Sequence, residues 1–279
     1  MNIEVKNLNK KFDEFALKDV SIDIPKGKIV GLIGENGAGK TTLIKCILGA
    51  MVKDSGTIKL FGKDYDNLAK DDIGVVYDDS FMIETFTSKD INMVLKNMYK
   101  KWDSKLYFKY LKEYKIPTKK EIRKLSTGMK KKLEIVAALS HHPKVLILDE
   151  PTSGLDPVIR SEVLDIFKNF VDNNENSILL STHITSDLEH IADNVIFISN
   201  GEIIFDRPLK EIKDDYIELD IDKNNFKDIN KKDIIRYKEN RLDYQVLVHK
   251  KNMKKEYEKY ITHLTTLDDI MLLYIKGEK

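Results

Sequence analysis

One short stretch limits what this chain can fold into more than any other. Residues 34–42 read Gly-Glu-Asn-Gly-Ala-Gly-Lys-Thr-Thr, which fits the P-loop pattern G-x-x-x-x-G-K-[ST] at every fixed position. An apolar segment of strand type precedes it at residues 28–33, and a helical pattern follows at 41–48. Because this order is the context that the motif needs, a chance glycine-rich turn is disfavoured. The stretch therefore predicts a site for a nucleoside triphosphate.

The residue types of this loop suit a polyphosphate. Glycines allow the backbone N–H groups and the helix N-terminus to point at negative charge. Lys40 is expected to reach the β- and γ-phosphates, and Thr41 to place its hydroxyl on Mg²⁺. The predicted phosphate-binding residues are Gly34, Asn36, Gly37, Ala38, Gly39, Lys40, Thr41 and Thr42.

Length and charge set broad limits. A chain of 279 residues is long for one domain and suggests one large α/β unit with a smaller one. With 47 Lys and Arg against 46 Asp and Glu, the charge balance does not indicate nucleic acid or an anionic membrane as a partner. The sequence has neither an apolar run of membrane-spanning length nor the apolar core of a signal peptide at its N-terminus. The chain alone is expected in the cytoplasm.

The segment before the P-loop predicts two strands. Residues 3–5 and 20–24 alternate apolar and polar, as half-buried strands do, and are expected to form an antiparallel lip before the nucleotide core. Phe12 lies between them on a turn-like connection. Its ring is either a stacking platform for adenine or an ordinary core side chain, and the residues alone leave both interpretations open.

The segment after the P-loop changes from strands to helices. Residues 55–62 read as turn, strand and turn, and residues 73–77 as a buried strand ending at Asp78 and Asp79. From 87 to about 116, apolar residues recur at helical spacing, with Ser88 and Asp90 available as an N-cap. This helical insertion is either packed core or a docking face for a partner.

A second helix start and a pair of carboxylates follow. Ser126 is expected to cap a helix that continues to Leu139, and its N-terminus could bind an anion or simply be capped. A buried strand at residues 145–149 then ends in Asp149 and Glu150. Consecutive strand residues face opposite ways, so we assign Asp149 to the Mg²⁺ shell and Glu150 to a water aimed at the γ-phosphate. His183 follows the next predicted strand, at 177–182.

With these motifs in this order, the chain resembles the ATP-binding cassette (ABC) ATPases, specifically the nucleotide-binding subunits of ABC transporters. The likeness covers roughly residues 1–213 and includes the family's signature, here Leu125-Ser126-Thr127-Gly128-Met129. It implies an α/β P-loop NTPase core: a mixed sheet with flanking helices, an antiparallel β lip and a helical signature subdomain at about 79–140. Residues 1–213 would form this nucleotide-binding domain, and residues 214–279 a small C-terminal α/β appendage.

The resemblance also implies roles in a head-to-tail dimer that holds two ATP molecules. Ser126 and Gly128 would close over the ATP of the other subunit, and Asp156 would communicate across the dimer. Phe12 becomes the expected adenine stacker, and His183 would contact the γ-phosphate and hold the water of Glu150. Glu150, His183 and Lys40 are then the predicted catalytic residues.

Two departures from the family pattern bear on coupling. Asp78 stands where the family usually has glutamine, and it would reach Mg²⁺ through water. Thr127 and Met129 give the signature a form similar to that of bacterial exporters whose ATPase is a separate chain. Because Glu150 and His183 are both present, we expect ATP hydrolysis.

The C-terminal residues carry their own pattern of strands and a helix. Residues 216–221 and 244–248 alternate as strands. Thr265 to Asp268 reads as a capping box for a last helix that ends at Gly277.

The sequence therefore predicts an ATPase, with ATP and Mg²⁺ as cofactors, that powers a separate multi-span membrane permease, with export favoured over import. It would sit at the cytoplasmic face of the membrane as a homodimer or as a heterodimer with another ABC ATPase; nucleic acid is not expected. Two alternatives are a soluble ABC ATPase acting on nucleic acid or ribosomes, and a regulatory, weakly hydrolysing half of a heterodimer.

Overall fold

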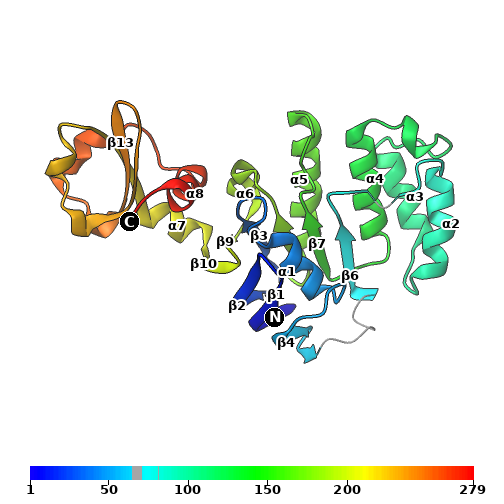
Figure 1. The fold of residues 1–279 in the computed structure, drawn as a ribbon. Coiled ribbons are helices and arrows are strands. Elements are labelled where there is room, and N and C mark those ends of the chain that lie inside the picture. The colour runs from blue at the N-terminus through cyan, green and yellow to red at the C-terminus, as the bar shows by residue number, and fades with distance from the viewer. Residues whose placement is uncertain (65–70, 81) are drawn as a thin grey trace.

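The computed structural model describes residues 1–64, 71–80 and 82–279 (Figure 1). The strands are β1 Ile3–Lys11, β2 Ala16–Ile24, β3 Ile29–Ile33, β4 Ser55–Leu60, β5 Lys63–Asp64, β6 Ile73–Val76, β7 Val145–Asp149, β8 Ser177–Ser181, β9 Asn194–Ser199, β10 Glu202–Pro208, β11 Tyr216–Asp222, β12 Ile234–Glu239 and β13 Asp243–His249. The α-helices are α1 Lys40–Ile47, α2 Ser88–Met98, α3 Ser104–Glu113, α4 Thr127–Leu139, α5 Pro157–Val171, α6 Thr185–Ile191, α7 Leu209–Asp215 and α8 Leu267–Lys276.

A six-stranded sheet in the order β10-β9-β3-β8-β7-β6 forms the centre of the molecule. All its neighbours pair in parallel except β10 and β9. Every residue of β3, β7 and β8 is buried, as expected of parallel strands covered on both faces. The segments that follow β3, β6 and β7 therefore leave the sheet at one edge.

The predicted antiparallel lip is a four-stranded sheet in the order β2-β1-β4-β5. Its strands are longer than the alternation indicated, because β1 continues to Lys11 through register shifts after Val5 and Leu8 that break the period of two. A buried apolar cluster that includes Val5, Leu32 and Ile44 fills the space between this sheet, the central sheet and α1.

Helices α2, α3 and α4 lie together at one end of the molecule (Figure 1) and share a cluster around Tyr107 and Leu133. The predicted N-cap of α2 is wrong. Thr87 caps this helix: its hydroxyl accepts from Asp90 N, and Asp90 accepts from Thr87 N, which is a capping box. Ser88 lies inside the first turn, and its hydroxyl donates to the Pro117 carbonyl.

At the other end, β11, β13 and β12 form an antiparallel sheet, with α8 beside it (Figure 1). Strand β12 was not predicted, because its residues are half-buried almost throughout and do not alternate. The capping box of α8 pairs Thr266 with Asp269, one residue later than predicted. The hydroxyl of Thr265 instead accepts from Glu218 N at 2.7 Å.

The proposed domain boundary at residues 213 and 214 falls inside α7. A buried apolar cluster continues across it: the rings of Phe197 and Phe205 lie 5.9 and 6.1 Å from that of Tyr274 on α8. The division thus stays a prediction. Within the described residues, none of the helices combines the length and apolar character needed to cross a bilayer.

Candidate nucleotide site

A cavity of about 840 Å³ opens where β3, β6 and β7 end. It joins the P-loop, the start of α1, the residues after β6 and the two carboxylates that end β7. Its walls are Glu14, Phe15, Glu35, Asn36, Gly37, Gly39, Lys40, Thr41, Thr42, Lys45, Tyr77, Asp78, Asp79, Asp149 and Glu150.

Glycine is required in the P-loop at the turn into α1. Gly39 has a φ of 113°, and a Cβ there would lie 2.7 Å from a Leu17 methyl and 2.8 Å from the Phe15 ring. A side chain would therefore both strain the backbone and clash. No side chain of the described residues caps α1, so the N–H groups of its first turn remain for an anion.

Lys40 lies at the floor of this cavity and is 6% exposed. Its ammonium donates to the Gly34 carbonyl at 2.7 Å and lies 3.8 Å from Glu150 Oε1. Burial lowers the pKa of Lys40, and the charges of Glu150 and Asp149 oppose that shift. These carboxylates thus help to keep a buried cation in place beside the P-loop.

Thr41 and Asp149 suit a hard divalent cation. The Thr41 hydroxyl donates to Asp149 Oδ2 at 3.0 Å. The other oxygen, Asp149 Oδ1, is buried without a hydrogen-bond partner among the described residues. Mg²⁺ prefers such oxygen ligands. Asp78 is exposed on the same cavity wall, where it could contact the ion through water.

Glu150 lies just after the end of β7 and lines the same cavity as Asp149, so its direction is not set by strand alternation. Its backbone has a φ of 49°, in the left-handed region, and its N–H donates to the Ser181 carbonyl on β8. Such strained backbone is common at functional sites. Glu150 Oε2 lies 2.8 Å from His183 Nδ1 and also accepts from His183 N at 3.3 Å. The two adjacent carboxylates thus have separate partners.

Comparison with known proteins agrees with this geometry. A family model described as ABC transporter matches residues 17–153. The chain is 34% identical over 220 residues to the ABC transporter ATP-binding protein YtrB of Bacillus subtilis (strain 168), covering 78% of this chain and 75% of that protein. It belongs to the ABC transporter ATP-binding proteins.

Other relatives support the same assignment. This ABC protein is 34% identical over 208 residues to the lantibiotic transport ATP-binding protein SrtF of Streptococcus pyogenes, covering 74% of this chain and 90% of that protein. A solved structure described as the ATP binding subunit of an ABC transporter matches with a TM-score of 0.69 at 28% identity, covering 76% of this chain and 92% of that one. The predicted ABC ATPase fold is therefore confirmed.

Several predicted site residues of this ABC ATPase do not line the cavity; His183 lies outside it, and Ser126, Gly128 and Asp156 lie at or near helix starts. Ser126 caps α4 and accepts from Met129 N, and Asp156 caps α5 by accepting from two backbone N–H groups. Gly128 packs against Ile159 so closely that a Cβ would lie 2.8 Å from its methyl. The signature and Asp156 thus lie together, away from their own P-loop.

Phe12 is not on the cavity wall. Its ring is 39% exposed and lies 6.2 Å from that of Phe15, which is on the wall. Phe15 was not predicted, although it is a second aromatic residue only three positions after Phe12, and that proximity was the available signal. Lys45 was not predicted either; it lies one helical turn beyond Thr41 on α1 and also lines the cavity.

Proposed function

We propose that this chain binds and hydrolyses ATP to drive a separate multi-span membrane permease, and that it works in export. The observation that carries the proposal is that Glu150 shares one cavity with Lys40, Thr41 and Asp149 and is paired at 2.8 Å with His183, which lies outside the lining of that cavity. An ATP-binding subunit without catalytic function would not need a histidine held against this carboxylate. The signature form Ser126-Thr127-Gly128-Met129 supports the export direction by its resemblance to exporter ATPases.

The side chains divide the work of phosphoryl transfer. Thr41 and Asp149 would hold Mg²⁺, which neutralises phosphate charge when bound. Lys40 would exchange the Gly34 carbonyl for the β- and γ-phosphate oxygens. Glu150 would orient the attacking water and accept its proton, and His183 would hold the carboxylate in position.

We further propose that two such subunits act as a head-to-tail dimer, a homodimer or a heterodimer. Ser126 and Gly128 lie at a helix start that does not face their own cavity, and a second subunit would place them on the open side of the partner's ATP. Asp156 lies beside them through the contact of Gly128 with Ile159. In this arrangement one chain supplies half of each site.

An apolar groove between β6, α2 and α4 is the proposed docking site for an apolar segment of the permease. It has a volume of about 170 Å³, and two of its lining residues, Ile83 and Met98, are 53% and 67% exposed. Val75 in the groove precedes Asp78 of the cavity, and Ala137 belongs to the helix that Ser126 caps. A bound segment would thus contact both elements and hold the chain at the cytoplasmic face of the membrane.

Substitution of Glu150 tests hydrolysis. We expect Glu150→Gln to slow steady-state phosphate release by about 100-fold or more, since general-base catalysis is worth roughly 10²–10⁴-fold. ATP affinity should be retained. Glu175→Gln, which removes an exposed carboxylate paired with Lys26, is the control and should hydrolyse normally. Unchanged phosphate release in Glu150→Gln would mean that Glu150 is not the base.

Co-purification in mild detergent tests the permease. A tagged chain should recover a multi-span membrane protein, and Met98→Glu should abolish that recovery without loss of ATP binding. Met93→Glu is the matched control, because Met93 is 61% exposed on the same helix but does not line the groove. Recovery of ribosomes or nucleic acid instead would favour the soluble ABC ATPase, and a second ABC ATPase would indicate a heterodimer.

A further inference from the structure

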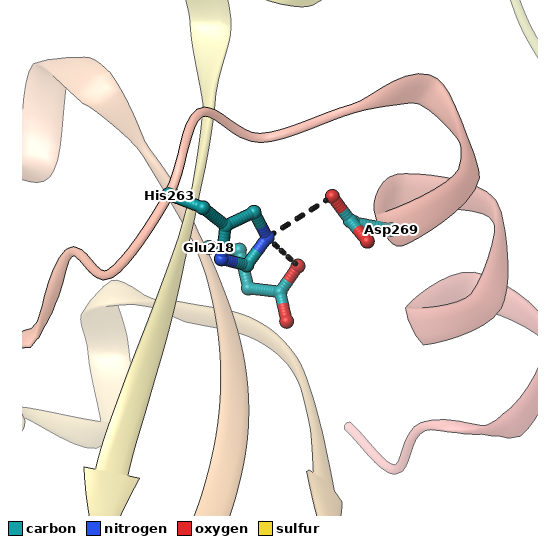
Figure 2. Close-up of side chains that lie close together, drawn as sticks. All are labelled: Glu218, His263 and Asp269. Atoms are coloured by element: carbon teal, nitrogen blue, oxygen red, sulfur yellow. Dashed lines mark hydrogen bonds and ion pairs between the residues drawn. The ribbon is translucent and has the colours of Figure 1, made fainter. Parts of the chain in front are cut away.

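Three side chains that could bind a metal meet in the C-terminal part of the chain, apart from the nucleotide cavity (Figure 2). Glu218 comes from β11, His263 from the segment before α8, and Asp269 from the first turn of α8. His263 Nε2 lies 3.7 Å from Glu218 Oε2 and 3.3 Å from Asp269 Oδ2. The three atoms all lie within 4.8 Å of one another.

Glu218 is the least expected member of this cluster, because its side chain is only 1% exposed. Gln245 donates to its Oε1 at 2.9 Å, but its Oε2, which faces His263, has no hydrogen-bond partner among the described residues (Figure 2). A buried carboxylate oxygen without a partner is costly unless a cation satisfies it.

The charge around the cluster is unbalanced. In the part of the chain that the structure describes, neither lysine nor arginine forms an ion pair with Glu218, Asp220 or Asp269. Their shared ionic partner is His263, which carries at most one positive charge. A divalent cation would balance this charge better than the imidazole does.

We propose that Glu218, His263 and Asp269 bind a divalent transition-metal ion, and that Zn²⁺ fits them best. Zn²⁺ accepts imidazole nitrogen together with carboxylate oxygen. Ligand atoms at 2.0–2.2 Å from a tetrahedral Zn²⁺ lie about 3.3–3.6 Å apart, close to the distances of 3.3 and 3.7 Å from His263 Nε2. His263 is 44% exposed, which leaves a route for the ion and a fourth position for water.

Each of the three ligands is held by a neighbour, as in established metal sites. His263 Nδ1 lies 2.9 Å from the Thr262 hydroxyl and 3.8 Å from Asp220 Oδ2. A proton on Nδ1 would therefore leave the Nε2 lone pair for the metal. Asp269 Oδ2 accepts from Thr266 N at 2.8 Å, so the capping box fixes its position.

The bound ion would join β11, the segment before α8 and α8 itself. The start of α8 also contacts the ATPase core, because Leu267 N donates to Glu189 on α6 at 2.7 Å. The metal site would thus stabilise the contact between the start of α8 and α6. This inference does not depend on the proposed transport function.

Metal titration of the full chain tests the proposal. The protein is first dialysed against chelator and then titrated with Zn²⁺ in excess Mg²⁺, with bound zinc measured by elemental analysis. We expect one equivalent to bind and to raise the melting temperature. His263→Gln and Glu218→Gln should each weaken binding by about tenfold or more, since even partners that merely orient ligands are worth 10–100-fold. His142→Gln, at an exposed histidine beside Asp103, should bind as the unchanged chain does.

Folding of the variants is checked by their melting in the absence of zinc. Glu218→Gln keeps the shape of the side chain and removes a buried charge, so it should melt no lower than the unchanged chain without metal. The proposal is overturned if zinc does not bind with saturation, or if both variants bind as tightly as His142→Gln. If Glu218→Gln fails to fold, the zinc affinities of His263→Gln and His142→Gln test the proposal, and equal affinities overturn it.

Discussion

At the scale of single residues, Phe15 lines the nucleotide cavity, and Phe12 lies beside Phe15 but off the cavity wall. Phe15 lies beside the turn at Gly39, whereas the centre of the Phe12 ring is 6.2 Å from that of Phe15 and Phe12 is 39% exposed. Phe12 stays the predicted adenine stacker through the resemblance to the ABC ATPases, whereas Phe15 is the aromatic ring that lines the cavity.

Removal of the Phe12 ring should weaken binding of the base and not of the phosphates. Stacking of a base on an aromatic ring is worth about 1–3 kcal/mol, so Phe12→Ala should raise the dissociation constant for ATP by about 5- to 150-fold. The affinity for tripolyphosphate, which lacks a base, should be the same in Phe12→Ala as in the unchanged chain, as measured by its displacement of bound ATP. Phe108→Ala, at a similarly exposed ring on α3, is the control. If only Phe15→Ala lowers the affinity for ATP, the adenine ring stacks on Phe15 and not on Phe12.

Residue-level prediction worked where local chemistry allows few solutions. The P-loop needs its glycines and lysine at fixed spacing, so its place at the cavity could be predicted. The direction of Glu150 could not be predicted from strand alternation, because β7 ends at Asp149 and Glu150 has a φ of 49°. The caps were less certain, because Thr87 and Ser88, or Thr265 and Thr266, offer the same hydroxyl one position apart. Which of the two residues caps the helix depends on the backbone conformation there. Tertiary contacts, such as the one between Thr265 and Glu218, influence that conformation.

At the scale of elements, α4 connects the signature to the cavity through a buried ion pair. Lys131 is 8% exposed, donates to the Tyr77 carbonyl at 3.0 Å and lies 3.1 Å from Glu134, which is 3% exposed. This pair was not predicted, because charged residues usually lie on the solvated face of a helix. Packing against β6 buries them, and periodicity within one element cannot report what covers it.

Breaking this pair should destabilise the chain. Lys131→Met leaves Glu134 buried and unpaired, which costs about 3–5 kcal/mol in comparable sites. The double variant Lys131→Met with Glu134→Leu should recover much of that loss. Denaturant unfolding measures both, and Lys130→Met, at the neighbouring and more exposed lysine, should change the free energy of unfolding little. Equal loss in the single and double variants would show that the pair itself is unimportant.

At the scale of the whole molecule, the proposed domains share a buried seam. Tyr274 on α8 packs against Phe197 and Phe205 of the central sheet, and its ring lies 6.3 Å from that of Tyr216 on β11. Such aromatic contacts add to the free energy of area burial. The ATPase core and the C-terminal sheet should therefore unfold together.

Calorimetry of a Tyr274 variant tests this cooperativity. Tyr274→Ala should lower the free energy of unfolding by about 2–3 kcal/mol, below the range for a fully buried ring. One transition should move to lower temperature as a whole. Tyr274→Phe keeps the ring packing and should cost much less. Two separate transitions, with the one for the ATPase core unmoved, would instead make residues 214–279 an independent unit.

Topology explains which parts of this arrangement the sequence could predict. The order of strands and motifs along the chain identified the central sheet and the edge where its parallel strands end. The packing of Tyr274 on the central sheet could not be predicted, because it joins α8 to strands about 70 residues earlier. The composition of α8 does not indicate which element it packs against.

The assembly of the cavity from distant strands has a consequence during synthesis of the protein. Thr41 and Asp149 are separated by 108 positions, and Glu150 and His183 by a further 33. A ribosome thus releases the phosphate-binding loop long before the carboxylates and histidine that complete the site. With the proposed function, ATP hydrolysis would begin only after Asp149, Glu150 and His183 have joined the P-loop in the folded chain.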